Sequence, residues 1–153
     1  MANRVFTKFH VDIGIGDAII SEPEWKKGED ILRFAGINPP RVAMLPIEQH
    51  FAEKIHAFSY PREERPFSRT RDLVDLVLLI EQGLPDNKNL IASAIKATFN
   101  RRLTHAIPDR LESPPELIQD SYTRMAHDCG VKKKTMKEAW LLLKEYWEEL
   151  PLS

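Results

Sequence analysis

The stretches PIEQHFAEKIHAF (residues 46–58) and SRTRDLVDLVLLIEQG (residues 68–83) decide the fold of this chain, because each sets charged side chains within a helical apolar pattern. Four apolar residues of the first stretch follow the i, i+4, i+8, i+11 spacing of one helical face: Ile47, Phe51, Ile55 and Phe58. Lys54 falls on that same face, seven residues after Ile47. The pattern predicts a helix that carries one lysine among the side chains that it buries.

The second stretch is apolar almost all round, which is typical of a buried helix. Asp72 and Asp75 are the exceptions, and because they lie three residues apart they are neighbours on the helix surface. A buried charge is costly unless it has a partner or a ligand. We therefore expect Lys54 to lie close to Asp72, and this pair of helices is the best candidate for a functional site.

Composition is that of one globular domain. The chain has 153 residues, of which 42% are hydrophobic and 29% charged, with a formal net charge of −1. A net charge this small gives no overall electrostatic attraction to nucleic acid or to an anionic membrane, so such a contact must use a local patch of charged side chains. The single cysteine, Cys129, excludes an internal disulfide and suits a reducing compartment. Without a signal-peptide pattern or an apolar run near the roughly 20 residues of a membrane helix, the sequence predicts a cytoplasmic protein.

The sequence predicts an α+β fold with a short β region over residues 1–45 and a mainly helical region over residues 46–153. A half-buried strand is indicated by the alternating residues Phe9, Val11, Ile13 and Ile15. A charged loop is then expected over residues 21–28, a short helix over 29–35 closed by Gly36, and a short strand over 41–45. Five helices follow, over residues 47–58, 69–82 and 87–102 and opening at Ser113 and at Thr135.

Capping boxes are expected to start the last two helices. The two sequences are Ser113-Pro-Pro-Glu116 and Thr135-Met-Lys-Glu138. A regular apolar stripe follows in the last helix: Met136, Trp140, Leu143, Trp147 and Leu150. This stripe is more typical of a core than of a ligand site.

The two opening stretches together also resemble a known family. An E-x3-A-E-K pattern (Glu48, Ala52, Glu53, Lys54) is followed by R-D-x-x-D (Arg71, Asp72, Asp75), a combination similar to that of the AbiEii/AbiGii nucleotidyltransferase toxins. These are the toxin halves of type IV toxin–antitoxin and abortive-infection systems. FHVDIGIGD and TFNRRLTHAIPDRLESPPE also resemble segments of that family, so the resemblance covers nearly all of the chain. It implies a short β remnant of a nucleotidyltransferase sheet followed by a helical C-terminal domain.

The resemblance implies transfer of a nucleotide from an NTP to an acceptor such as the 3′ end of tRNA, with Mg²⁺ held by carboxylates. Asp12 stands where the family has a metal-binding carboxylate; otherwise it is an ordinary polar residue on a strand. Lys54 would contact the triphosphate, and a salt bridge to Asp72 would be part of the same design; the alternatives are a lysine whose stem only covers apolar surface and one that only fastens the two helices. Asp72 and Asp75 would orient Lys54 or contribute to the nucleotide site, with Asp72 slightly preferred. Glu48 would support the site from the edge of the apolar face.

One departure from the family pattern changes the expected activity. Family members open with a glycine-containing turn and an Asp-x-Asp pair, and this sequence contains no Asp-x-Asp. We therefore expect a chain that corresponds to the latter part of the family and is catalytically incomplete. The alternative is a non-catalytic helical module that binds nucleotide, RNA, a cognate antitoxin or a missing N-terminal half. A homodimer that pairs through an exposed strand edge is a third possibility.

Basic residues provide further candidates for phosphate contacts. Arg69 and Arg71 precede or open the aspartate helix and could hold nucleotide phosphates. A basic stretch that could meet an RNA backbone comprises Lys96, Arg101, Arg102, His105 and Arg110. For both sets, ordinary solvated side chains are an equal alternative. The five histidines show no spacing typical of a zinc site.

Overall fold

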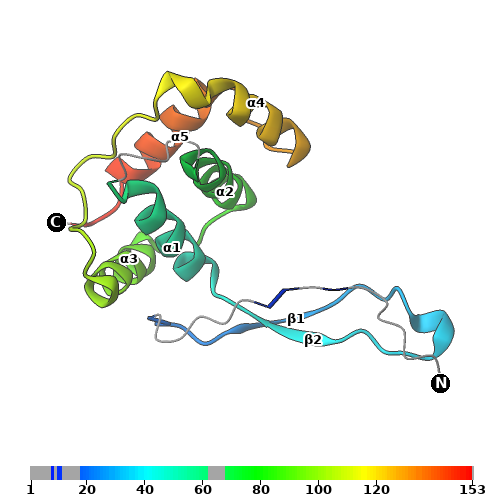
Figure 1. Cartoon of the computed structure of the whole chain (residues 1–153). Coiled ribbons are helices and arrows are strands. Elements are labelled where there is room, and N and C mark those ends of the chain that lie inside the picture. Colours follow the sequence, from blue (N-terminus) through cyan, green and yellow to red (C-terminus); the bar gives the residue numbers. More distant parts are fainter. Residues whose placement is uncertain (1–7, 9, 12–17, 62–67, 153) are drawn as a thin grey trace.

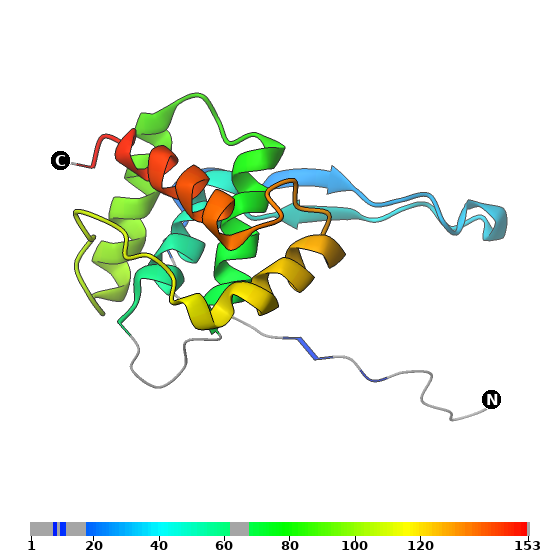
Figure 2. The same cartoon turned by 90° about the horizontal axis from the view of Figure 1, so that it is seen from above.

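The computed structural model describes residues 8, 10, 11, 18–61 and 68–152. Its elements in chain order are β1 (Glu24–Lys27), the 3-10 helix η1 (Arg33–Ala35), β2 (Arg41–Met44), α1 (Ile47–Ser59), α2 (Ser68–Gln82), α3 (Lys88–Arg102), the 3-10 helix η2 (Glu116–Ile118), α4 (Gln119–Asp128) and α5 (Met136–Glu148). Figures 1 and 2 show the α-helices gathered into one bundle, from which β1 and β2 extend. This short sheet followed by helices confirms the predicted α+β class.

The two strands form an antiparallel hairpin in which Glu24 pairs with Met44 and Lys27 with Arg41. The prediction of a charged loop over residues 21–28 was therefore wrong. Charged side chains are tolerated in this strand because β1 is exposed along its whole length. The helix expected over residues 29–35 is also shorter, a single 3-10 turn that ends at Gly36 in the left-handed region, with φ 72°. Only glycine adopts that conformation without strain, so the predicted stop was correct.

Residues 18–45, which we call the β arm, lack a core of their own. Large exposed apolar side chains run along the arm: Ile19, Ile20, Trp25, Ile31, Leu32, Phe34, Ile37, Val42, Met44 and Leu45. Phe34 at η1 is the most exposed of them, at 88%. An isolated two-stranded hairpin is marginally stable in water, and an exposed apolar surface of this kind marks an interaction site.

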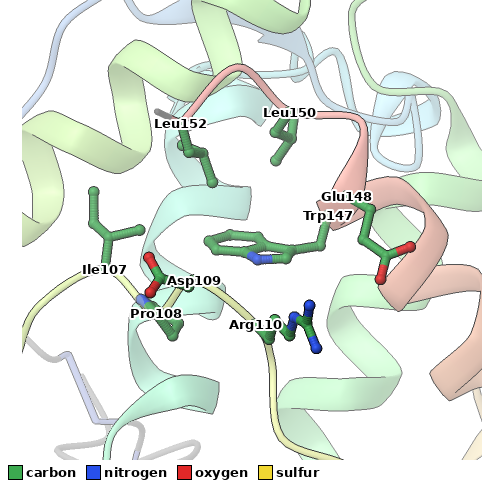
Figure 3. Close-up of a pocket in the computed structure, with 8 residues that line it drawn as sticks. All are labelled: Ile107, Pro108, Asp109, Arg110, Trp147, Glu148, Leu150 and Leu152. Atoms are coloured by element: carbon green, nitrogen blue, oxygen red, sulfur yellow. The ribbon is translucent and has the colours of Figure 1, made fainter.

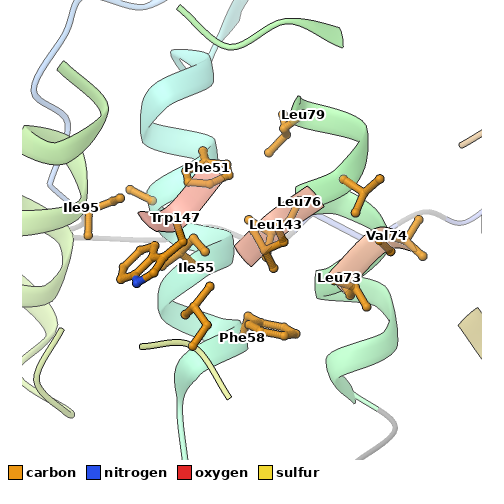
Figure 4. Close-up of a cluster of buried hydrophobic side chains, with 14 of the residues drawn as sticks. Phe51, Ile55, Phe58, Leu73, Val74, Leu76, Leu79, Ile95, Leu143 and Trp147 are labelled. Atoms are coloured by element: carbon orange, nitrogen blue, oxygen red, sulfur yellow. The ribbon is translucent and has the colours of Figure 1, made fainter. Parts of the chain in front are cut away.

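The helical bundle buries a single apolar cluster to which all five α-helices contribute, and Figure 4 shows part of it. The predicted apolar face of α1 lies in this core, with Phe51, Ile55 and Phe58 buried. Helix α2 is buried on most of its surface, as its nearly uniform apolar sequence predicted. Leu143 and Trp147 of the predicted α5 stripe face the same core. Burying each large apolar side chain contributes about 1.5–3 kcal/mol, so this cluster is the main stabilising element.

The helix starts differ in how well they were predicted. The capping box at Thr135 and Glu138 is present, with both reciprocal hydrogen bonds formed. The box predicted at Ser113 is absent: the chain remains extended at Pro115 and enters α4 through η2. Two consecutive prolines explain the difference, because a proline disfavours the helical conformation in the residue before it. Asn87 caps α3 through its side chain, which accepts from the Leu90 N–H.

Most of the strand predicted around residues 9–15, including Asp12, lies outside the described residues. Within the described ranges, no helix is long and apolar enough to cross a membrane.

Candidate functional site

The predicted contact between Lys54 and the aspartates is present. Lys54 projects from the middle of α1 toward α2, where its Nζ lies 2.6 Å from Asp75 Oδ2 and 4.0 Å from Asp72 Oδ1. The closer partner is thus Asp75, whereas the sequence slightly favoured Asp72. All three side chains are partly accessible, with 26% of Lys54, 15% of Asp72 and 30% of Asp75 exposed. The group is therefore shielded on one side by the helices and open to a ligand on the other.

Helix α1, which carries Lys54, is attached to α3 through side chains on another face of the helix. The carboxylate of Glu53 forms an ion pair with the Arg102 guanidinium. Gln49 donates to Glu53 Oε1 at 3.2 Å and to Thr98 Oγ1 at 2.9 Å. Consecutive residues Glu53 and Lys54 thus point to opposite neighbours, one to a cation of α3 and the other to the anions of α2. These contacts fix the orientation of α1 and so the direction in which the Lys54 side chain leaves the helix.

His50 is a further member of the site that the sequence analysis did not select. It lies one helical turn before Lys54, and its pKa is lowered by burial and by the Lys54 ammonium, with Asp75 acting in the opposite direction. The i, i+4 spacing from Lys54 was the signal that could have identified it. At neutral pH His50 is thus an uncharged imidazole beside a cation, able to donate a hydrogen bond from one ring nitrogen and accept one at the other.

A cavity of about 300 Å³ adjoins the site between the β arm and the helix pair. Its apolar lining comes from both parts: Met44, Leu45, Ile47, Leu78 and Leu79. Polar groups enter it from Asp75, His50, Gln82 and the ion pair between Lys26 and Glu24. An apolar hollow with a few convergent polar groups is the usual form of a small-molecule site.

The remaining predicted residues lie apart from Lys54 or at its margin. Glu48 is buried within the bundle, with 5% of its surface exposed. The ion pairs of Lys54 are formed with Asp72 and Asp75 instead. Arg71 is exposed on α2, and Arg69 donates to the Tyr60 carbonyl oxygen at 3.0 Å. The basic stretch does not form one stripe: Lys96 contacts the Pro151 carbonyl, whereas Arg102 pairs with Glu53.

A polar network surrounds His56 at the C-terminal end of α1. Its Nε2 lies 2.8 Å from Thr104 Oγ1, and the imidazole ring packs against Phe99 and His105. Burial first, then the Arg102 guanidinium and His105, lower the pKa of His56 to about 4. The residue is therefore neutral at physiological pH and serves the packing of α1 against α3.

The described residues do not form a magnesium site by themselves. Among them no group of three or more His, Cys, Asp and Glu side chains is placed to hold a metal ion. The carboxylates of Asp72 and Asp75 face a lysine ammonium, which competes with a cation for the same oxygens. A metal would need other carboxylates, and Asp12, the predicted ligand, lies outside the described residues.

Comparison with known proteins agrees with this architecture. The family model described as Nucleotidyl transferase AbiEii toxin, Type IV TA system, matches residues 1–148, which is nearly the whole chain. The comparison with curated protein sequences gave no match. Nucleotidyltransferases of this kind generally use a divalent metal, and type IV systems pair a toxin with an antitoxin. The chain therefore belongs to the AbiEii nucleotidyltransferase toxin family.

Proposed function

We propose that Lys54, held by Asp72 and Asp75, binds the phosphates of an NTP in a nucleotide-transfer reaction. The observation that carries the proposal is the position of the Lys54 ammonium, 2.6 Å from Asp75, beside the cavity that Asp75 and His50 line. A compact ammonium group suits phosphate oxygens, and a flexible lysine stem allows it to move from a carboxylate to a ligand. The nucleoside would occupy the apolar cavity, with its phosphates directed to Lys54.

The aspartates have a positioning role in this proposal. Before a nucleotide binds, they pair with Lys54 and keep its ammonium at the mouth of the site. Once the triphosphate arrives, Lys54 balances phosphate charge that would otherwise meet two carboxylates. Arg71, exposed one residue before Asp72, could add a second contact to the phosphates, and Glu48 would support α1 from within the bundle.

Further groups are needed for the transfer itself. Magnesium, when bound, would neutralise phosphate charge and activate the attacking hydroxyl. We propose Asp12 as one of its ligands and place the other carboxylates, the Asp-x-Asp pair that this sequence lacks, on another polypeptide segment. Residues 1–45 would then complete a nucleotidyltransferase sheet with that segment, which would cover the exposed apolar side chains of the β arm. The proposed acceptor is the 3′ end of tRNA.

The second candidate function is a non-catalytic module that binds nucleotide, RNA or a protein partner. The missing Asp-x-Asp pair and the exposed β arm favour it for this chain acting alone. The protein partner would be an antitoxin, the segment that carries the catalytic pair, or a second copy joined through the strand edges of the arm. Binding of nucleotide without transfer to tRNA identifies this function.

Calorimetric titration with each of the four NTPs, in the presence of Mg²⁺, tests the proposed site. Wild type should bind at least one of them, and Lys54→Met should weaken binding by at least about tenfold, since a hydrogen bond to a charged group is worth on the order of 1.5–3 kcal/mol. Lys88→Met is the matched control, because Lys88 pairs with Glu149 outside this cavity. Circular dichroism verifies folding of both variants. Equal binding by wild type and a folded Lys54→Met would refute the site.

A further inference from the structure

We propose that the chain contains a second anion site, a phosphate-binding pocket at the C-terminal end of α1 that does not include Lys54. The pocket has a volume of about 220 Å³ and lies between the end of α1, the first turn of α2 and the connection from α3 to η2. Its polar lining combines residues that are far apart in the sequence: Ser59, Arg69, His105, Arg110 and Glu112. The inference is independent of the nucleotide site proposed above.

Two guanidinium groups give the pocket its charge. Arg69 is held at the wall by one hydrogen bond, donated from Nη2 to the Tyr60 carbonyl oxygen at 3.0 Å. A guanidinium has five N–H donors in a rigid fork, so this bond orients the group and leaves donors for a ligand. Arg110 lines the pocket from the connection that follows α3. Paired, fork-shaped donors are the side chains best matched to phosphate.

The other polar groups are positioned by hydrogen bonds to one another. The Ser59 hydroxyl lies 2.9 Å from His105 Nε2, and the Thr104 hydroxyl lies 3.1 Å from His105 Nδ1. Both ring nitrogens are thus occupied, which fixes the imidazole, and burial lowers its pKa so that it is neutral at physiological pH. Glu112, which is exposed, is the only carboxylate among the described lining residues. Among the described lining residues, two arginines therefore stand against one glutamate.

An adjoining cavity, lined by apolar side chains and by the carboxylates of Asp109 and Glu148, offers a place for the organic part of a phosphate ligand. Pro108 and Arg110 line both cavities, and the second has a volume of about 490 Å³. Figure 3 shows the Trp147 indole ring in it, between Leu150 and Leu152 on one side and the Pro108–Arg110 segment on the other. A phosphate held by Arg69 and Arg110 can therefore be a free anion or part of a nucleic-acid backbone, whose adjoining sugar or base would lie in this second cavity.

Titration of the ¹⁵N-labelled full chain with inorganic phosphate, with chloride at matched ionic strength as reference, tests the pocket. We expect saturable shifts of the Ser59 and His105 amides and of Arg69 Nε. Arg110→Gln should weaken phosphate binding by at least about tenfold, whereas Arg124→Gln, an exposed arginine on α4, should not change it. Glu112→Gln should tighten binding, a gain that loss of folding cannot produce. Lys54→Met should bind phosphate here as wild type does.

Equal weakening by Arg110→Gln and Arg124→Gln, or shifts that never saturate, would overturn the proposal, as would weaker binding by Glu112→Gln. A ten-nucleotide single-stranded RNA distinguishes the two sources of phosphate. Displacement of inorganic phosphate from the Ser59 and His105 signals by this RNA supports a backbone phosphate as the ligand. Phosphate shifts that the RNA leaves unchanged support a free phosphate anion in the same pocket.

Discussion

The ion pair between Lys54 and Asp75 should contribute measurably to folding, and more than the pair between Lys54 and Asp72. Exposed ion pairs contribute about 0–1 kcal/mol, whereas breaking a buried pair costs about 3–5 kcal/mol. Lys54 and Asp75 are 26% and 30% exposed with 2.6 Å between their charged atoms, which places them between these limits. We expect a coupling energy of about 1–2 kcal/mol for this pair. At 4.0 Å, the coupling to Asp72 should be about 0.5 kcal/mol or less.

A double-mutant cycle measures both couplings. Urea unfolding of Lys54→Met, Asp75→Asn, Asp72→Asn and the two double variants gives each free energy of unfolding, and these near-isosteric changes retain the packing of the side-chain stems. Lys54→Met alone should be the least stable single variant, because it leaves two neighbouring carboxylates without their cation. The reasoning fails if the coupling with Asp75 is below about 0.3 kcal/mol, within the usual deviation from additivity, or if Asp72 couples more strongly.

Two further outcomes follow from the structure. Burial, Arg102 and His105 lower the pKa of His56 from 6.5 to about 4, so the unfolded chain binds the proton more tightly than the folded chain does. The free energy of unfolding should therefore fall as the pH drops, by about 1–2 kcal/mol between pH 7 and pH 5. Urea unfolding at both pH values should show a smaller fall for His56→Gln, and an unchanged fall would contradict the assignment. Thr135→Ala should lower the free energy of unfolding by about 1 kcal/mol through loss of the α5 cap. Thr123→Ala, on an exposed side chain of α4, is the control, and equal losses in the two variants would argue against a special role for the cap.

Helical periodicity was sufficient to predict the pair of helices that carries the candidate site. The apolar spacing of Ile47 to Phe58 predicted α1, and the displaced charges Lys54 and Asp72 predicted which faces of α1 and α2 meet. The sequence could not decide between Asp72 and Asp75, because the rotation of α2 about its axis depends on how the whole bundle packs. The i, i+4 spacing between His50 and Lys54 could have placed His50 in the same site, but the histidines were considered only as zinc ligands.

The errors occurred where local sequence was ambiguous. Strand β1 has the composition of a loop, and only its pairing with β2 makes it a strand. The false capping box at Ser113 has the right residue types, but Pro114 and Pro115 delay the helix. The pocket formed by Arg69, His105 and Arg110 depends on contacts between segments separated by more than thirty residues, which periodicity does not report.

The most direct test of the central claim is to observe the Lys54 ammonium group itself. In a chain with labelled lysines, the Lys54 Cε and Nζ resonances, assigned by comparison with Lys54→Met, are followed during titration with an NTP and Mg²⁺ and, in parallel, with the corresponding nucleoside. Transfer of the ammonium from Asp75 to phosphate predicts a saturable shift with the triphosphate that the nucleoside does not produce, while Lys88 stays unchanged. Lys54 resonances that do not move at saturating nucleotide would contradict a phosphate-binding role and leave the lysine as a link between α1 and α2.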